Sequence, residues 1–434
     1  MERTTANRDV AHRRGRFRPR RGSTYIIVLA VALIVSTIGL SVMMITRVLA
    51  RQTTSANDWS EAATLAHSAV EHGLTMVNND SSWRSGYANG VPIAEKPLGR
   101  GTISWTLEDT DGSLTEPDTS LRLTGIGKVG NTTRVYSVQL EGLPQILDVF
   151  QRATYSTEDI LVSAEITATG GPISTPATLT VNNTLNGDAE AGTLVNAGTI
   201  TGTTTTPFDA LTMPAPGVFD TYLALATEIP FSSIPDAKIS NTVLSDASNP
   251  YGVPNPDAVY HVNVPAGSSL QITASRLVAT LLLTLNANST VKTAAANLWQ
   301  TPSDNYPMLI IKGTTGSQVD LNGFALGILK EASSHANYNP PGTPYEGQTD
   351  DDQLDVYPNE FNGLIHVIGS ATQVNAGSNF VLKGSLVSEG PVTLGSNYNV
   401  TLDPSLYDNP PYGYTQSSGE IVTVAGTWRW DAAP

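Results

Sequence analysis

The stretch Ser23–Met44 reads STYIIVLAVALIVSTIGLSVMM and carries neither a charge nor a proline. As an α-helix these 22 residues would be about 33 Å long, enough to cross a hydrocarbon core of roughly 30 Å. A run of six arginines lies between Arg13 and Arg21, whereas Arg47 alone follows the stretch closely. Because basic flanks stay on the cytoplasmic side, the sequence predicts a single-pass protein of the cytoplasmic (inner) membrane. The N-terminus would lie inside, and the C-terminal region would be periplasmic or extracellular.

Charge is distributed unevenly about this span. The first 50 residues carry nine arginines against Glu2 and Asp9, while the remaining chain carries 15 basic and 37 acidic residues. An acidic exported region argues against a nucleic-acid partner. The chain has no cysteine, which excludes disulfides and thiol chemistry.

The helix is expected to continue beyond the membrane. Apolar residues recur at helical spacing between Ala62 and Val77, and Asn78, Asn79 and Asp80 then end the pattern with turn-forming residues. A continuous helix within residues 23–80 would be roughly 80 Å long. The alternative is a membrane helix, a break near Thr53–Asp58, and a second amphipathic helix.

Strand patterns follow in residues 81–150. Apolar and polar residues alternate in Thr102–Leu107, Leu121–Thr124 and Val135–Leu140. Asp109–Gly112 lies between the first two and is typical of a hairpin turn. The sequence therefore predicts an α+β fold in which the long helix precedes a small antiparallel β head.

Residues 151–434 are expected to form a second, mainly β domain. Short Val/Ile/Leu/Thr runs separated by Gly, Asn or Asp indicate a parallel β-solenoid, with a β-sandwich as the alternative. Two stretches, 201–254 and 331–361, interrupt the pattern as polar insertions, the second a surface loop. Trp428 and Trp430 are expected to cap the last coil. The runs on which this prediction rests are 166–171, 179–182, 193–200, 277–285, 308–313, 363–369, 380–388, 392–395 and 399–403.

No catalytic motif is found. The sequence lacks a G-x-S-x-G elbow, a phosphate-binding loop and an H-E-x-x-H pair, so we expect neither an enzyme nor a bound cofactor. Asp109 and Asp111 are weak calcium candidates, for which a turn between strands is the preferred interpretation.

A second acidic group stands in the 331–361 stretch. Asp350, Asp351, Asp352 and Asp355 could bind a hard cation or provide paired carboxylates for glycoside cleavage. Three consecutive carboxylates repel one another and favour contact with water. A solvated acidic loop is therefore the preferred interpretation.

The junction Arg21-Gly22-Ser23 resembles the prepilin signal of type IV pilins and type II secretion pseudopilins. The resemblance implies cleavage after Gly22 by a prepilin peptidase, with the lipid bilayer and other pilin or pseudopilin subunits as partners. Major members carry a glutamate five residues after the cut, where this chain has Ile27, so the resemblance is to minor, tip-type members. The stretch EAATLAHSAVEHGL (61–74) is similar to the spine of minor pseudopilins. WTLEDTDGSL (105–114), LRLTGIGKVG (121–130) and RVYSVQLEG (134–142) are similar to the head of planctomycete-type pilin-related proteins.

Three functions compete at this point. The leading hypothesis is a membrane-anchored, exported structural protein, a minor pilin or pseudopilin-like subunit with a tip or adhesive role. The second is a signal-anchored surface enzyme that cleaves polysaccharide with Asp351, Asp352 or Asp355. The third is a membrane-anchored scaffold without a filament.

Overall fold

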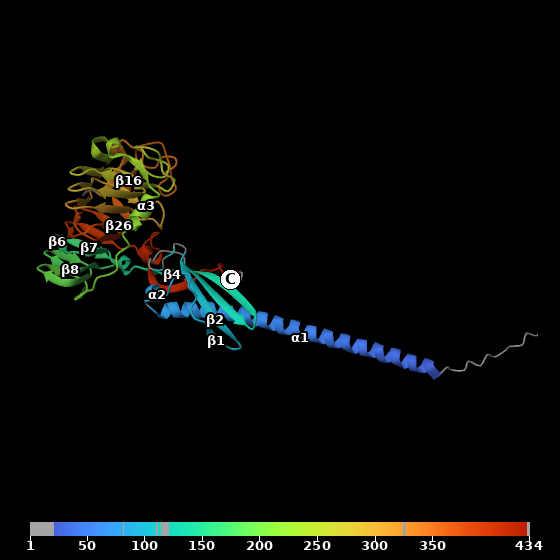
Figure 1. Cartoon of the computed structure of the whole chain (residues 1–434). Helices are drawn as coiled ribbons and strands as arrows, with labels where there is room; N and C mark the ends of the chain where they lie inside the picture. Colours follow the sequence, from blue (N-terminus) through green and yellow to red (C-terminus); the bar gives the residue numbers. More distant parts are fainter. Residues whose placement is uncertain are drawn as a thin grey trace, which may run out of the picture. The chain divides into compact units, whose positions relative to one another are not determined.

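The computed structural model divides the chain into two compact units at Leu143/Pro144 and Ser418/Gly419 (Figure 1). The first, here called the anchor-head unit, contains the start of the chain and also its end; the second, the solenoid unit, is Pro144–Ser418. The predicted β-rich domain, 151–434, therefore extends too far, because the chain from Gly419 onward belongs to the anchor-head unit. The structure describes residues 21–80, 82–109, 112, 114, 121–323 and 327–431.

Helix α1 runs unbroken from Arg21 to Asn79, over 59 residues, and confirms the continuous spine. The expected alternative, a break near Thr53–Asp58, is wrong. Neither glycine nor proline interrupts this part of the helix. The hydroxyls of Thr53 and Thr54 donate to the carbonyls of Leu49 and Ala50, at 2.9 Å each, so polar side chains are satisfied within the helix.

The anchor-head unit pairs α1 with an antiparallel sheet in the order β1-β2-β3-β4-β31, and β32 also pairs with β4. Figure 1 shows these strands beside the C-terminal half of the helix. The antiparallel head is therefore confirmed, with β31 and β32 added from the C-terminus. The elements are α2 Trp83–Gly86, β1 Lys96–Leu98, β2 Gly101–Asp109, β3 Leu121–Val129, β4 Thr132–Ile146, β31 Thr415–Thr423 and β32 Arg429–Asp431.

The helix lies directly on β3 because small residues face one another. Ala62 and Ala66 of α1 are fully buried. A Cβ placed on Gly127 would be 2.3 Å from the Ala62 carbonyl oxygen, and one on Gly125 would be 2.3 Å from that of Ala66. Glycine is thus required at both positions, where any side chain would separate helix from sheet.

The solenoid unit is built on a 24-stranded sheet whose pairings are parallel. The predicted parallel β-solenoid is confirmed and the β-sandwich alternative is wrong. A separate antiparallel pair joins β24 (Ile328–Lys330), directly before the second insertion, to β25 (Val356–Pro358), near the end of that insertion. Short helices are η1 Asp148–Gln151, α3 Val218–Leu223, η2 Phe231–Ser233, η3 Pro235–Ala237, α4 Glu331–Ser334 and α5 Ser405–Asp408. The strands are β5 Thr154–Ser156, β6 Ile160–Val162, β7 Ile166–Thr169, β8 Ile173–Val181, β9 Thr184–Asn186, β10 Ala189–Asn196, β11 Thr199–Ile200, β12 Thr204–Thr205, β13 Thr227–Glu228, β14 Lys238–Ser240, β15 Val243–Leu244, β16 Val259–Val264, β17 Ser269–Thr273, β18 Arg276–Val278, β19 Thr280–Leu285, β20 Thr290–Ala294, β21 Leu298–Gln300, β22 Leu309–Gly313, β23 Gln318–Asn322, β26 Glu360–Ile368, β27 Gln373–Gly377, β28 Val381–Ser388, β29 Val392–Leu394 and β30 Tyr398–Thr401.

The coils do not stack in sequence order. From β5–β7 the chain builds the coils β8–β9 and β10–β11 in one direction, and β12 then pairs with β10 on the next level. It then crosses to the far end of the stack at β13–β15, and each later coil returns toward the start. The last coil, β28–β30, pairs with β5–β7. Entry and exit therefore lie on neighbouring coils.

The stretch 201–254 was expected to be an insertion, and this was wrong in part, because it supplies β12 and the whole end coil β13–β15. These strands are only two or three residues long. Alternation cannot be recognised over so few residues.

Aromatic rings form a ladder inside the coils. Phe361 lies 4.4 Å from Phe380 and 6.1 Å from Trp299 between ring centroids, and Phe380 stacks on Tyr398 at 6.1 Å. Outside the coils, one apolar face is covered by the crossing segment with α3, and another by the β24–β25 insertion. The solenoid unit therefore has an apolar core inside the coils and further apolar clusters between the coils and these two segments.

We predict that Gly127→Val lowers the free energy of unfolding by about 3 kcal/mol, since the new side chain must push α1 off the sheet. Thr124→Val, a half-buried site on the opposite face of β3, is the control and should change it by less than about 1 kcal/mol. Urea unfolding of the full chain in detergent, followed by tryptophan fluorescence, measures both. Equal stability of Gly127→Val and the parent would contradict the close contact.

Candidate functional site

The N-terminal part of α1 has no partner within the described residues. Every residue from Thr24 to Ala50 is exposed, although the stretch is apolar. Among the described residues, α1 from Thr24 onward is the one helix long and apolar enough to cross a membrane. The predicted span Ser23–Met44 lies inside it, compatible with a single membrane anchor.

The predicted processing residues Arg21, Gly22 and Ser23 are the first three residues of α1. Arg21 and Gly22 end the predicted basic cytoplasmic leader, residues 1–22, of which residues 1–20 lie outside the described residues. Ile27, at the position where major pilins carry glutamate, is 61% exposed. Recognition of this junction by a peptidase stays a prediction.

Asn78, near the end of α1, connects the helix to Ile421 of β31. The amide of Asn78 donates to the Ile421 carbonyl at 2.9 Å and accepts from the Ile421 amide at 2.7 Å. Nearly two turns earlier, His72 Nδ1 accepts from the indole of Trp105 at 3.1 Å. Burial, followed by the charge of Lys96, lowers the pKa of His72. These contacts bind the helix to β31 at one side of the sheet and to β2 near the other side.

Trp428 and Trp430 do not cap the solenoid, so that expectation was wrong. Trp428 stacks on His67 of α1 at 4.6 Å between ring centroids, and Trp430 of β32 lies 3.6 Å from the ring of Tyr136. Trp430 also stacks on Trp59 at 6.0 Å. The two tryptophans therefore fasten the C-terminus to the anchor-head unit.

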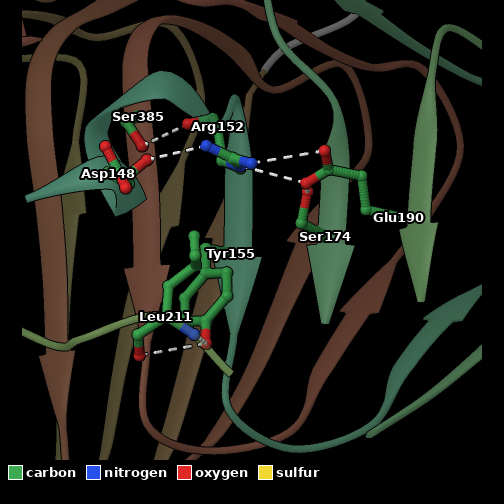
Figure 2. Close-up of polar contacts among 7 residues, drawn as sticks. All are labelled: Asp148, Arg152, Tyr155, Ser174, Glu190, Leu211 and Ser385. Atoms are coloured by element: carbon green, nitrogen blue, oxygen red, sulfur yellow. Dashed lines mark hydrogen bonds and ion pairs between the residues drawn. The ribbon is translucent and has the colours of Figure 1, made fainter. Parts of the chain in front are cut away.

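Where the chain enters the solenoid unit, Arg152 forms a network of hydrogen bonds and an ion pair (Figure 2). Arg152 donates from Nε to Glu190 Oε2 at 3.0 Å and from Nη2 to Glu190 Oε1 at 3.3 Å. The same carboxylate accepts from Ser174, while Ser385 of the last coil donates to the Arg152 carbonyl at 2.7 Å. Figure 2 also shows Tyr155, whose hydroxyl accepts from the Leu211 amide at 2.9 Å. Nothing in the sequence singled out Arg152, because its partners are distant in sequence.

Of the two predicted calcium candidates, Asp109 and Asp111, the structure describes the first. Asp109 is buried at the end of β2, where its backbone amide donates to Asn89 Oδ1 at 2.7 Å. Gly112, with φ +92°, donates to the Asp109 carbonyl at 3.2 Å, which fits the turn interpretation. Asp111 lies outside the described residues, so the calcium role of this pair stays untested.

The second acidic group is partly assembled. Asp350 and Asp352 gather with Glu331, and their ligand oxygens lie within 4.8 Å of one another. Asp351 is exposed and is not part of this group. Sequence reasoning missed Glu331, which is fully buried; its only signal was a carboxylate at the start of the polar insertion.

We predict that Arg152→Met lowers the free energy of unfolding by about 3 kcal/mol, because it leaves the Glu190 carboxylate, 17% exposed, without its counter-charge. Lys312→Met is the control, since Lys312 pairs with Asp220 and the two side chains are 47% and 67% exposed. It should cost less than about 1 kcal/mol. Urea unfolding followed by far-UV circular dichroism compares them, and equal losses would refute the role of Arg152.

Comparison with known proteins gives few matches. No protein-family model and no curated protein matches the chain. Among solved structures, the competence-associated pilin ComZ from Thermus thermophilus matches at 10% sequence identity and a TM-score of 0.22. The match covers 86% of this chain and 98% of that chain.

Proposed function

We propose that the chain is a membrane-anchored, minor pilin or pseudopilin-like subunit that displays a β-solenoid outside the cytoplasmic membrane. The role is structural, and the solenoid is the displayed module, with a tip or adhesive function. Processing by a prepilin peptidase and assembly with other pilin-like subunits belong to the same proposal.

One observation carries this proposal: a single helix has an exposed apolar half and a second half that forms the core of the head. The exposed apolar half, Thr24–Ala50, needs a bilayer or the packed helices of a filament to cover it. The other half is docked through Ala62 and Ala66 onto glycines of β3. This is the plan that the resemblance of the Arg21–Ser23 junction implies.

The placement of the solenoid supports display. In the sequence, the solenoid unit is inserted between two strands of the head, β4 and β31. These two strands are neighbours in the head sheet. Gln145 and Gln416, at its two ends, are joined by a hydrogen bond of 3.3 Å. A module whose ends meet can be carried in a loop without opening the host sheet.

Ile27 suits a subunit present in few copies. In this family a glutamate at that place would neutralise the terminal amine of a neighbouring subunit in a low-dielectric assembly, and an isoleucine cannot. Ile27 fits best at the first or outermost position of a filament, where no preceding subunit presents a terminal amine that needs a counter-charge.

Gly22→Val is predicted to prevent processing and to leave the basic leader attached, since a side chain at the cut would crowd the peptidase site. The span itself is unchanged, so the variant should still insert in the membrane. N-terminal sequencing of protein purified from membranes reads the result, with Ser23 as the expected first residue of the parent.

Gly39→Val is the matched control, because Gly39 lies within the span and has open space around its Cα. It should be processed like the parent. A parent protein that begins at Met1 or at Arg51 would overturn the prepilin proposal in favour of a plain anchor or a secreted protein.

The proposed topology has its own test. Protease added to spheroplasts of the producing bacterium should digest the solenoid unit, because the arginine excess before the span keeps only the leader inside. The same treatment after solubilisation is the control for intrinsic protease resistance. A solenoid unit that is degraded only after solubilisation would show that the orientation is reversed.

A further inference from the structure

One end of the solenoid is closed. In the end coil β13–β15 the inward-facing side chains of Ile239 and Leu244 are fully buried. Phe231 and Tyr251, from segments next to these strands in the sequence, pack against the same core. This end needs no further cover, because its last apolar layer is already removed from water.

The other end, formed by β10 and β11, is here called the open end. Leu194 is in register with Leu179 of the neighbouring coil, and Ile200 is in register with Leu185. Leu179 and Leu185 are fully buried, because β10 and β11 lie over them. Leu194 and Ile200 belong to the same core but stay partly exposed. The last layer of the apolar core therefore faces water at the open end.

The open end also presents unpaired backbone. Beyond Glu190, β10 pairs with β8 on one side and with no described strand on the other, and β11 pairs with β9 alone among the described strands. Such an edge carries a row of free amide and carbonyl groups, which proteins ordinarily protect with lysine or proline. Residues 191–206 contain neither a charged residue nor a proline. This edge is therefore available for pairing with another strand.

The distribution of charge sets the open end apart from the rest of the solenoid unit. The unit as a whole has 24 acidic residues against 7 basic ones. In residues 166–208, which include the two coils at the open end, the charged residues are Asp188 and Glu190 alone. Glu190 pairs with Arg152, and Asp188 accepts two hydrogen bonds from Thr203. Two copies of this acidic unit repel one another over most of their surface, but not at the open end.

We propose that the open ends of two copies of the chain join, β10 to β10 in antiparallel orientation, and form a two-fold symmetric dimer. Antiparallel pairing brings identical rows of amide and carbonyl groups into complementary positions. It also places the exposed core layers, with Leu194 and Ile200, against one another, so that the apolar core continues across the interface. Since each chain has one open and one closed end, the assembly stops at two copies.

A second copy suits the open end better than a partner of different sequence. A charged segment of another protein would gain no ion pair at this neutral edge. It would also have to provide an unprotected strand of its own, which natural proteins avoid exposing. A second copy supplies both the free edge and the uncovered apolar layer.

The test is the oligomeric state of the full chain in detergent, with micelles in excess, measured by sedimentation velocity over a range of concentrations. The parent should form a dimer. Val195 of β10 is 48% exposed, and Val195→Lys should weaken dimerisation at least about tenfold, because it places like charges of the two copies at the shared edge.

Val253→Lys is the matched control, because Val253 is 74% exposed and lies between β15 and β16, outside the open end. It should change the dissociation constant of the dimer by less than about threefold, since its charge lies away from the interface. Both valines are exposed, so neither variant should disturb folding, and far-UV circular dichroism checks this.

Cysteine cross-linking locates the contact, because the chain has no cysteine of its own. With a short bis-maleimide reagent, Val195→Cys should give a covalent dimer and Val253→Cys should not. A monomeric parent would overturn the proposal and leave the edge to a strand of another protein. A dimer that Val195→Lys leaves unchanged would also overturn it, because association would then occur elsewhere, as through the apolar part of α1.

Discussion

The close approach of α1 to β3 is the contact on which the rest of the anchor-head unit depends. Gly125 and Gly127 leave no space for a side chain between the strand and the helix backbone. The helix can therefore be the core of the head along half its length and keep its apolar other half free of the protein. Since water is a poor surrounding for that half, it is compatible with a single membrane anchor, and the proposed function builds on this.

A second constraint governs the solenoid. The solenoid unit is a long insertion between two neighbouring strands of the head sheet. The sheet can form only if the two ends of this insertion lie close together. The chain meets this by building coils in one direction, crossing to the far end, and returning, so that β28–β30 pair with β5–β7. Arg152 and Ser385 join the first and last coils directly. The crossing segment then covers an apolar outer face that the coils alone would leave exposed.

The sequence predicted those features that repeat locally. Helical periodicity over Ala62–Val77 and short punctuated strands were sufficient for the spine and for the solenoid. Features decided by distant contacts could not be predicted. Arg122 pairs with Asp431 across 309 positions, so nothing near Trp430 revealed that the C-terminus completes the head. The two-residue strands of the end coil were too short for any pattern to show.

The candidate sites divide in the same way. The processing junction is a local motif, and cleavage there stays a prediction, whereas the acidic group contains a residue that the sequence did not indicate. Asp350 and Asp352 were visible as consecutive carboxylates, but Asp351 between them is exposed and does not belong to the group. Glu331 joins it through tertiary packing, because its burial is set by the fold of the insertion onto the solenoid.

The central claim is that one rigid helix joins the membrane to the head, and a distance measurement tests it most directly. The chain has no cysteine, so spin labels can be placed cleanly at Arg47 and Thr64 of the full chain in a bilayer. A continuous helix predicts a single narrow separation of about 25 Å between the two backbone positions. A broad distribution, or a clearly shorter separation, would show a break between anchor and head and would contradict the account.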